Sequence, residues 1–404
     1  MKNTRLFPLI AALLTGLGLL TAEAAELEKQ KLQVFILAGQ SNMVGHAHSI
    51  TIPALLTSEE PKDARLAKLA FKEGAIAPAA AREQLEIRIK RDELKAALSA
   101  KKITGDDQVA AAEAELKKLE EDYDARTNKI KAAFAVAERV YITSIADGHR
   151  RAGPLTFGFG GSDEKIGPEF GFGLSLEQKL DAPILLIKTS WGGKSLHYDF
   201  RPPAAGPYEL SEAEKAGDNA AQIAANAGLN YRMMNEAVRE VLADLKKYHP
   251  QYDPAVGYEM AGFVWFQGFN DQFSPAFREN YKTNMVAFVK DVRKDYETPA
   301  MPFVIGVMGT GVTQEEVDKN EVSVAQRAAA AAPEFAGNVA SVDSYPFYGL
   351  DALEIFNKGW AEHLLEFSLV GSERPYHYMG SGKFFTRFGD ALATSMVKLM
   401  KPAK

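Results

Sequence analysis

Residues 34–43 read Val-Phe-Ile-Leu-Ala-Gly-Gln-Ser-Asn-Met, a continuous apolar run that ends abruptly in a small polar turn. Such a run is typical of a strand that is buried on both faces and is followed by a helix, as in a parallel α/β sheet. Ser41 is then expected at the carboxyl end of the strand, the edge of such sheets where ligands bind. Taken alone, however, the pattern is more simply explained by a helix cap, because Ser41 and Asn42 are both good cap residues.

The N-terminal segment has the layout of a secretory signal peptide. Lys2 and Arg5 precede an apolar stretch over residues 6–20, and the small residues at 22–24 form a cleavage motif. We therefore predict a signal peptide over residues 1–25 and a periplasmic or extracellular location. The apolar stretch is shorter than the ~20 residues that cross a bilayer, so no membrane span is expected.

Composition limits the chemistry that the 404 residues can perform. The chain contains no cysteine, which excludes a thiol nucleophile, a cysteine-ligated metal and disulfide bonds. Its length allows one large α/β domain with an elaboration, or two domains. A net charge of -6 argues against nucleic acid or an anionic membrane as the partner.

Residues 61–147 differ from the rest of the chain, since they are rich in Ala, Lys, Glu and Leu. Apolar residues recur there every seven positions, at Val109, Leu116, Tyr123 and Ile130. This repeat predicts a helix at about 106–140, and an earlier helix near 81–100 is expected to pair with it. We interpret residues 61–147 as a coiled-coil-like helical insertion with a solvated charged face. A role in oligomerisation or in walling an active site stays open.

The rest of the chain alternates strand and helix patterns. Besides the opening run, strands are predicted at 183–188, 256–266, 302–308 and 339–342, and a closing helix at 380–399. Strands that alternate with helices imply a parallel sheet with right-handed crossovers. We therefore predict a three-layer α/β/α domain over residues 26–404, built on a five-stranded, mainly parallel sheet.

Three predicted strands end in small polar sequences. These are Gly-Gln-Ser-Asn at 39–42, Trp-Gly-Gly-Lys at 191–194 and Gly-Phe-Asn-Asp at 268–271. In a doubly wound sheet such strand ends meet at one edge, so the three sequences are expected to form one site.

The residues at these strand ends are the kinds that a serine hydrolase needs. Such an enzyme combines a hydroxyl nucleophile with hydrogen-bond donors for the oxyanion of the tetrahedral intermediate. Ser41 supplies a hydroxyl, while its own amide, the Gly193 amide and the Asn270 side chain are suitable donors. His377, just before the closing helix, is the candidate base.

In combination these blocks resemble the SGNH/GDSL hydrolases, and among them the sialate O-acetylesterase-like carbohydrate esterases. The matching blocks are residues 39–43, the Gly192-Gly193 turn, Trp-Phe-Gln-Gly-Phe-Asn-Asp at 265–271 and the segment around His377. The resemblance implies a flavodoxin-like sheet and an acetylated saccharide or polysaccharide as the substrate. It also implies a reaction that needs no metal ion or organic cofactor.

The resemblance also implies a role for each site residue. Ser41 would be the nucleophile that carries the acetyl group, and His377 would be its base. The oxyanion hole would consist of the Ser41 and Gly193 amides and the Asn270 side chain. Gly192 is an alternative to Gly193, because the sequence does not decide which of the two amides points inward.

The acid that orients the histidine departs from the family pattern. Related enzymes usually carry Asp three residues before the catalytic His, and Arg374 occupies that position here. The acid could be Glu373, or Asp343 after the last strand. It could also be replaced by a backbone carbonyl. We name Glu373 as the candidate.

Further candidates surround the predicted site. Gln40, Gln267, Trp191 and His197 are candidates for substrate binding, although buried amides often hold loops together and aromatic residues at strand ends are more often core. The His-Ala-His sequence at 46–48 is a weak metal signal without a third placed ligand.

The preferred hypothesis is an exported serine esterase that removes O-acetyl groups from carbohydrate. One alternative is a non-catalytic carbohydrate-binding protein on the same fold, since the departure at Arg374 would fit a lost activity. Another is an esterase for short non-sugar acyl esters.

Overall fold

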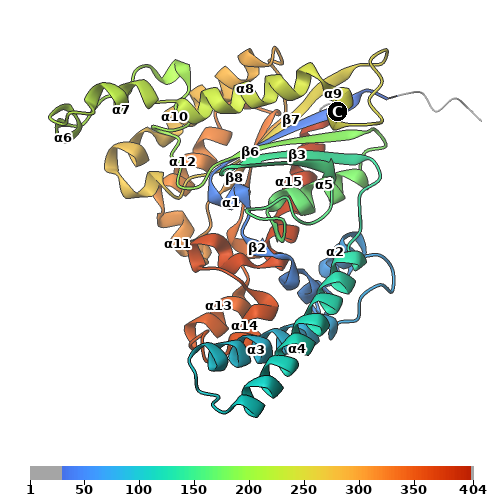
Figure 1. Cartoon of the computed structure of the whole chain (residues 1–404). Helices are drawn as coiled ribbons and strands as arrows, with labels where there is room; N and C mark the ends of the chain where they lie inside the picture. Colours follow the sequence, from blue (N-terminus) through green and yellow to red (C-terminus); the bar gives the residue numbers. More distant parts are fainter. Residues whose placement is uncertain (1–29, 402–404) are drawn as a thin grey trace, which may run out of the picture.

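A seven-stranded sheet with helices on both sides forms the centre of the protein in the computed structural model, which describes residues 30–401 (Figure 1). The strands lie in the order β4-β3-β6-β1-β7-β8-β9, and all neighbours are parallel except β3 and β4. Their bounds are β1 Leu32–Gly39, β3 Val140–Ala146, β4 His149–Pro154, β6 Ile184–Ser190, β7 Tyr258–Phe266, β8 Phe303–Val307 and β9 Val339–Asp343. The predicted signal peptide, residues 1–25, lies outside the described residues.

The two faces of the sheet carry separate hydrophobic cores. Along β1, Phe35 and Leu37 pack against α5 and α15, whereas Val34 and Ile36 pack on the opposite face beneath α8, α10 and α12. All four side chains are fully buried, which explains why β1 reads as a continuous apolar run. The covering helices are α5 Pro168–Glu177, α8 Leu229–Ala243, α10 Pro275–Asp295, α12 Glu321–Ala330 and α15 Gly382–Met400.

The remaining elements are short or lie outside these layers. They are α1 Ser41–Val44, α2 Pro61–Ala70, α3 Ala80–Ser99, α4 Asp106–Ala133, α6 Glu212–Lys215, α7 Ala220–Asn226, α9 Leu245–Tyr248, α11 Gln314–Lys319, α13 Leu350–Asn357 and α14 Leu364–Val370, with β2 Ala47–His48 paired to β5 Lys165–Ile166. Within residues 30–401, no helix combines the length and apolarity that crossing a bilayer requires.

The predicted three-layer architecture is confirmed, but the sheet has seven strands in place of five. The five predicted strands are β1, β6, β7, β8 and β9, whose order β6-β1-β7-β8-β9 is the flavodoxin-like order 2-1-3-4-5. The two strands that sequence reasoning missed, β3 and β4, extend the sheet beyond β6. Residues 140–146 therefore belong to the sheet, and the boundary of the helical segment that we placed at 147 was wrong. The helix predicted at about 106–140 includes Val140 and so conceals the start of β3, while β4 carries charged residues typical of an edge strand.

Helices α3 and α4 pack side by side and project from the main body (Figure 1). Helix α4 ends at Ala133, seven residues before the end that the heptad repeat predicts, because Phe134 takes an extended conformation and pairs with Phe71. The heptad residues Val109, Leu116 and Tyr123 are only half-buried, as expected where two helices cover one another without a third. Helix α3 also contacts α14, which ties the projection to the domain.

A buried ion pair supports the one-turn helix α1 from beneath. The Lys188 side chain on β6 is fully buried, and its Nζ donates to Val44 O at 2.8 Å and Phe159 O at 2.7 Å. Its third contact is Glu169 Oε2 at 2.8 Å, and Glu169 is also fully buried. All three ammonium donors are thus satisfied, and Val44 at the end of α1 is held in place.

We expect Lys188→Met to destabilise the protein by about 3–5 kcal/mol, because it leaves the Glu169 carboxylate buried without a cation. Adding Glu169→Gln should recover part of the loss, since the double variant buries no charge. Urea unfolding followed by circular dichroism measures the free energy of unfolding of the single and the double variant. A free energy of unfolding of Lys188→Met that lies within about 1 kcal/mol of the wild-type value would contradict this account.

Candidate active site

Ser41 lies at the carboxyl end of β1, as the first residue of α1. The cap of this helix is Gln40, and it makes no side-chain cap hydrogen bond, so the simpler explanation of Ser41 or Asn42 as a cap is wrong. Gly39 allows the turn, since a Cβ there would lie 2.1 Å from Phe266 O. Within residues 30–401, the half-buried Ser41 hydroxyl has no hydrogen-bond partner and is available to a ligand.

The Gln40 amide fastens the end of β1 to the loop after β7. Its Oε1 accepts from Gln267 Nε2, Gly268 N and Asn270 N, each at 3.2 Å, and its Nε2 donates to Asn270 Oδ1 at 3.1 Å. Gln267 Nε2 also donates to Lys194 O at 2.9 Å, in the loop after β6. Gln40 is 1% exposed and Gln267 is 3% exposed, so these amides act inside the protein as bridges between loops.

Asn270 and Gly193 carry hydrogen-bond donors in the loops after β7 and β6, the two strands that flank β1. Because Asn270 Oδ1 accepts from Gln40, its Nδ2 faces the opposite way, where it donates to Gly193 O at 2.8 Å and retains a second hydrogen. The Gly192 amide donates to both Asp147 carboxylate oxygens at 3.0 Å. The Gly193 amide has no acceptor within the described residues, so it is freer than Gly192 to bind an oxyanion.

Asp271 orders the loop that follows Gly193. It is fully buried, and its oxygens accept from Leu196 N at 2.9 Å and His197 N at 3.0 Å. Burial raises the pKa of this carboxyl to about 7. Through these contacts Asp271 has a structural role, because it orients the loop that contains Leu196 and His197.

His377 comes to the site in the 3-10 helix η6, Pro375–Gly380. Asn42 Nδ2 donates to Tyr376 O at 3.1 Å, which joins the residue after Ser41 to the residue before His377. Tyr378 has a left-handed φ of 51°, a strained conformation for a side chain of this size. It is held there because its buried ring stacks on Phe384 at 3.9 Å.

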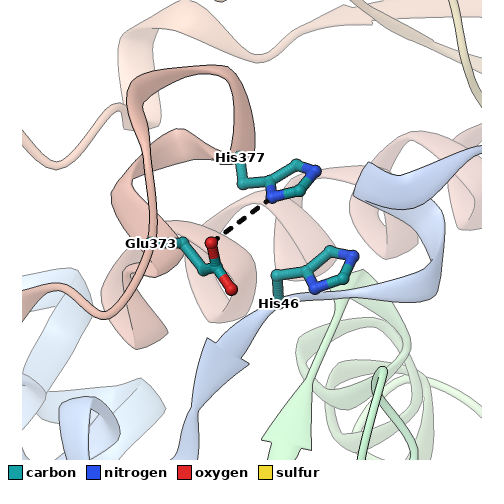
Figure 2. Close-up of side chains that lie close together, drawn as sticks. All are labelled: His46, Glu373 and His377. Atoms are coloured by element: carbon teal, nitrogen blue, oxygen red, sulfur yellow. Dashed lines mark ion pairs between the residues drawn. The ribbon is translucent and has the colours of Figure 1, made fainter. Parts of the chain in front are cut away.

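Glu373 is the carboxylate beside His377 (Figure 2). Its Oε2 lies 3.7 Å from His377 Nδ1, an ion-pair distance longer than a hydrogen bond, and its Oε1 lies 3.0 Å from Lys165 Nζ. Contact with His377 and the ion pair with Lys165 hold the pKa of Glu373 at about 2, against the opposing effect of burial. The buried His377 Nδ1 has no hydrogen-bond partner within the described residues, so its contact with Glu373 has room to shorten.

The other candidates for the acid point elsewhere. Asp343 accepts from Arg327 Nε at 2.9 Å. Arg374, at the position where the family usually has Asp, lies with its guanidinium over the rings of Phe356 and Trp360, at 5.9 and 5.5 Å.

His46 covers His377 on one face, as Figure 2 shows. The two rings are stacked, with centroids 4.2 Å apart and an 8° angle between their planes. Burial, followed by repulsion from His377 and Lys165, lowers the pKa of His46 to about 4. His46 is therefore neutral near neutral pH and can pack against a protonated His377.

The cluster of His46, Glu373 and His377 fits a metal ion poorly. Its ligand atoms lie within 4.8 Å of one another. However, an imidazole binds a metal in the plane of its ring, and two face-to-face rings cannot both aim a lone pair at one ion. The Lys165 ammonium also occupies one Glu373 oxygen. His48, which the sequence offered beside His46, contacts Glu164 instead, with Nε2 3.2 Å from Oε2.

Trp191 and His197, two candidates for substrate binding, lie mostly inside the protein. Each is 8% exposed. Trp191 packs in the core beside Phe200, with ring centroids 5.9 Å apart. His197 bonds to Asn284 through Nδ1 at 3.0 Å, and burial, followed by repulsion from Arg201, lowers its pKa to about 4.

Three residues near the site were not assigned to it from the sequence, which offered His46 only as part of a weak metal signal. Asp147 follows β3 and binds the Gly192 amide, but β3 itself was not recognised. Lys165 and His46 lie 208 and 331 residues before Glu373 and His377 respectively, so no local pattern relates them. The assembled groups suit acyl transfer: a hydroxyl at a helix N-terminus, a histidine with a carboxylate, and two oriented donors.

Comparison with known families gave a match to the one described as carbohydrate esterase, sialic acid-specific acetylesterase, over residues 139–350. The matched region contains Gly193 and Asn270 but neither Ser41 nor His377. Comparison with curated protein sequences gave no match.

Solved structures similar to this chain have low identities. A protein of Arabidopsis thaliana has 15% identity and a TM-score of 0.45, with coverage of 91% of this chain and 98% of that one. A carbohydrate acetylesterase from Xanthomonas citri has 10% identity and a TM-score of 0.39, and the match covers 90% of this chain and 55% of that one. NanS has 16% identity and a TM-score of 0.33, and the match covers 52% of this chain and 69% of that one. Values this low carry no inference about activity.

The pKa of about 4 for His46 predicts that its ring stays neutral until the solution is strongly acidic. An NMR pH titration of the histidine Cε1 signals, with His46→Gln to assign the peak, should show His46 titrating near pH 4. Because the unfolded chain takes up this proton at about pH 6.5, the stability that neutral His46 contributes is lost as pH falls from about 6.5 to about 4. A His46 peak that titrates near pH 6.5 would refute the buried, neutral stack.

Proposed function

We propose, from the premise that the chain belongs to the carbohydrate esterase family of sialic acid-specific acetylesterases, that it is an exported serine esterase removing O-acetyl groups from carbohydrate. The family makes the protein a hydrolase of acetyl esters on carbohydrate. The serine mechanism, the roles of individual residues and the export are our proposal.

One observation carries the mechanism: the nucleophile turn and the histidine turn are bonded to each other. The Asn42 side chain reaches Tyr376 O at 3.1 Å, so Ser41 and His377 are each one residue away from the same hydrogen bond. This bond spans 334 residues of sequence, and its Asn42 end directly follows β1, the strand at which the strand order reverses.

In the proposed reaction, His377 removes the proton of Ser41 while the serine oxygen attacks the acetyl carbonyl. Glu373 faces Nδ1, which leaves Nε2 for the exchange with Ser41. The Gly193 amide and the second hydrogen of Asn270 Nδ2 bind the oxyanion. The sugar hydroxyl leaves with the proton from His377, and water then releases acetate from Ser41.

Glu373 acts in this scheme as the carboxylate that stabilises the imidazolium. Its pKa of about 2 keeps it charged at any pH at which a histidine can serve as a base. Hydrogen bonds of free enzymes are often long and shorten in the reacting complex, so 3.7 Å is compatible with this role. Lys165 pairs with the other oxygen of the same carboxylate, which keeps Glu373 in place beside His377.

A non-catalytic binding protein is the main alternative, and its support was the Arg374 departure. With Glu373 beside His377, that departure no longer implies a missing acid. An esterase for short non-sugar esters would share the chemistry, and a panel of acyl donors would separate it from a carbohydrate esterase.

Ser41→Ala should reduce hydrolysis of p-nitrophenyl acetate by at least about 10⁴-fold, because the nucleophile is lost. A fluorophosphonate probe should label wild type but not this variant. Ser195→Ala is the matched control, since its hydroxyl donates to Asp199 Oδ2 at 2.9 Å and should not be the labelled atom. Full activity in Ser41→Ala would sink the serine mechanism, and an unlabelled, inactive wild type would favour the binding protein.

Glu373→Gln should lower kcat by roughly 10²–10⁴-fold, because the imidazolium loses its carboxylate. Asp343→Asn removes the alternative acid and should change kcat less than about threefold, because it disturbs only an ion pair with Arg327. Steady-state kinetics on p-nitrophenyl acetate measures both. The opposite ranking would transfer the role to Asp343, and two near-normal variants would favour a backbone carbonyl.

A further inference from the structure

We infer that three aromatic side chains beside the site form a subsite that stacks on the pyranose ring of the acetylated sugar. They are Phe269, Phe273 and Tyr376, which we call the aromatic row. This inference deepens the proposed function and rests on it, because it names the part of the substrate that the enzyme holds while Ser41 reacts.

The exposure of these rings is the first observation. Phe273 is 69% exposed and Tyr376 is 44% exposed, while Phe269 is half-buried. Among the residues with described side chains, the only other aromatic one with comparable exposure is Tyr258, at 38%. Two of the three exposed aromatic rings thus lie together beside the site, and exposed apolar patches of this kind mark binding surfaces.

The rings of the aromatic row lead directly to the proposed base. Phe273 and Phe269 have centroids 5.2 Å apart, and Phe269 and Tyr376 are 5.7 Å apart. The Tyr376 ring then lies 4.6 Å from that of His377. A sugar seated on the row is therefore beside the histidine, where its ester must lie for Ser41 to attack.

The backbone that fixes the catalytic groups also fixes the row. Phe269 immediately precedes Asn270, in the loop whose Gly268 and Asn270 amides both bind Gln40. Tyr376 immediately precedes His377, and its carbonyl accepts from Asn42. The backbone that carries Phe269 and Tyr376 is therefore fixed before a ligand arrives, which reduces the entropy lost on binding.

The chemistry of the row matches one face of a pyranose. The axial C–H groups of such a ring form an apolar face that packs on an aromatic ring, while its hydroxyls remain in water. Tyrosine adds a hydroxyl that can bind a neighbouring sugar hydroxyl. Such a surface selects for a ring, and it gives no advantage to an acetyl ester on an open chain.

Two substrates test this directly. Glucose pentaacetate carries an acetyl group at every position of a pyranose, whereas triacetin carries acetyl groups on an open chain. The measured quantity is the ratio of kcat/KM for the pentaacetate to kcat/KM for triacetin. We expect Phe273→Ala and Tyr376→Ala each to lower this ratio by about three- to tenfold, through a higher KM for the pentaacetate.

Two variants control for other effects. Phe273→Trp keeps an aromatic face and should keep the ratio at or above that of wild type. Tyr258→Ala removes a ring of similar exposure at the start of β7, the opposite end of the strand from the site, and should leave the ratio unchanged. Phe273 is exposed enough that its substitution should not affect folding.

Failure of the subsite and failure of the proposed function give different results. Wild-type hydrolysis with unchanged ratios in Phe273→Ala and Tyr376→Ala would overturn the subsite and leave the esterase standing. Calorimetric binding of glucose pentaacetate to Ser41→Ala protein, weakened by adding Phe273→Ala, would support the subsite even if no hydrolysis occurred. Binding unaffected by Phe273→Ala and Tyr376→Ala would overturn it.

Discussion

The hydrogen bonds of one buried amide, Gln40, determine how the loops at three strand ends of the site meet. Gln40 joins the end of β1 to the loop after β7, and Gln267 extends the connection to the loop after β6. Because Gln40 fixes which way the Asn270 amide points, the donor of Asn270 is directed toward Gly193 without any contact from substrate. A site assembled from three separate strand ends needs such a connection, since each loop alone could move independently of the others.

The second constraint is electrostatic and concerns a single carboxylate. Glu373 lies between Lys165 and His377, which in the proposed mechanism becomes a cation when it takes the proton of Ser41. Its charge is thus stabilised in the resting protein, and the proposed reaction leaves it available to His377. The neutral His46 ring, stacked on His377, adds apolar cover on the other side without adding charge. Arg374 packs its guanidinium over the Trp360 ring, and the carboxylate beside His377 comes from the preceding residue, Glu373.

Much of the fold could be predicted because β1 and the other central strands are buried on both faces, and burial leaves a strong apolar signal. The charged edge strand β4 leaves almost no apolar signal in the sequence. Strand β3 was missed because the helix predicted before it extends over its first residue. In the site, Ser41, Asn270 and His377 lie in short motifs, so they can be identified as candidates from the sequence alone. Contacts such as Lys165 with Glu373, or His46 with His377, depend on how distant loops fold together, and no local pattern encodes them. For Trp191 the sequence predicted a contact that the structure does not support: its motif suggested ligand binding, whereas its side chain lies in the hydrophobic core.

Strand β4 forms one edge of the sheet, where a strand of another chain could pair with its free backbone groups. The strand is short, it carries Arg150 and Arg151 in succession, and it ends at Pro154. Arg150 is drawn toward Glu240 on α8, and Arg151 toward the carbonyls of Gly158 and Gly160. Such features are those by which natural sheets resist edge-to-edge aggregation. The antiparallel strand β4 therefore protects its edge of the sheet from unwanted pairing with another chain.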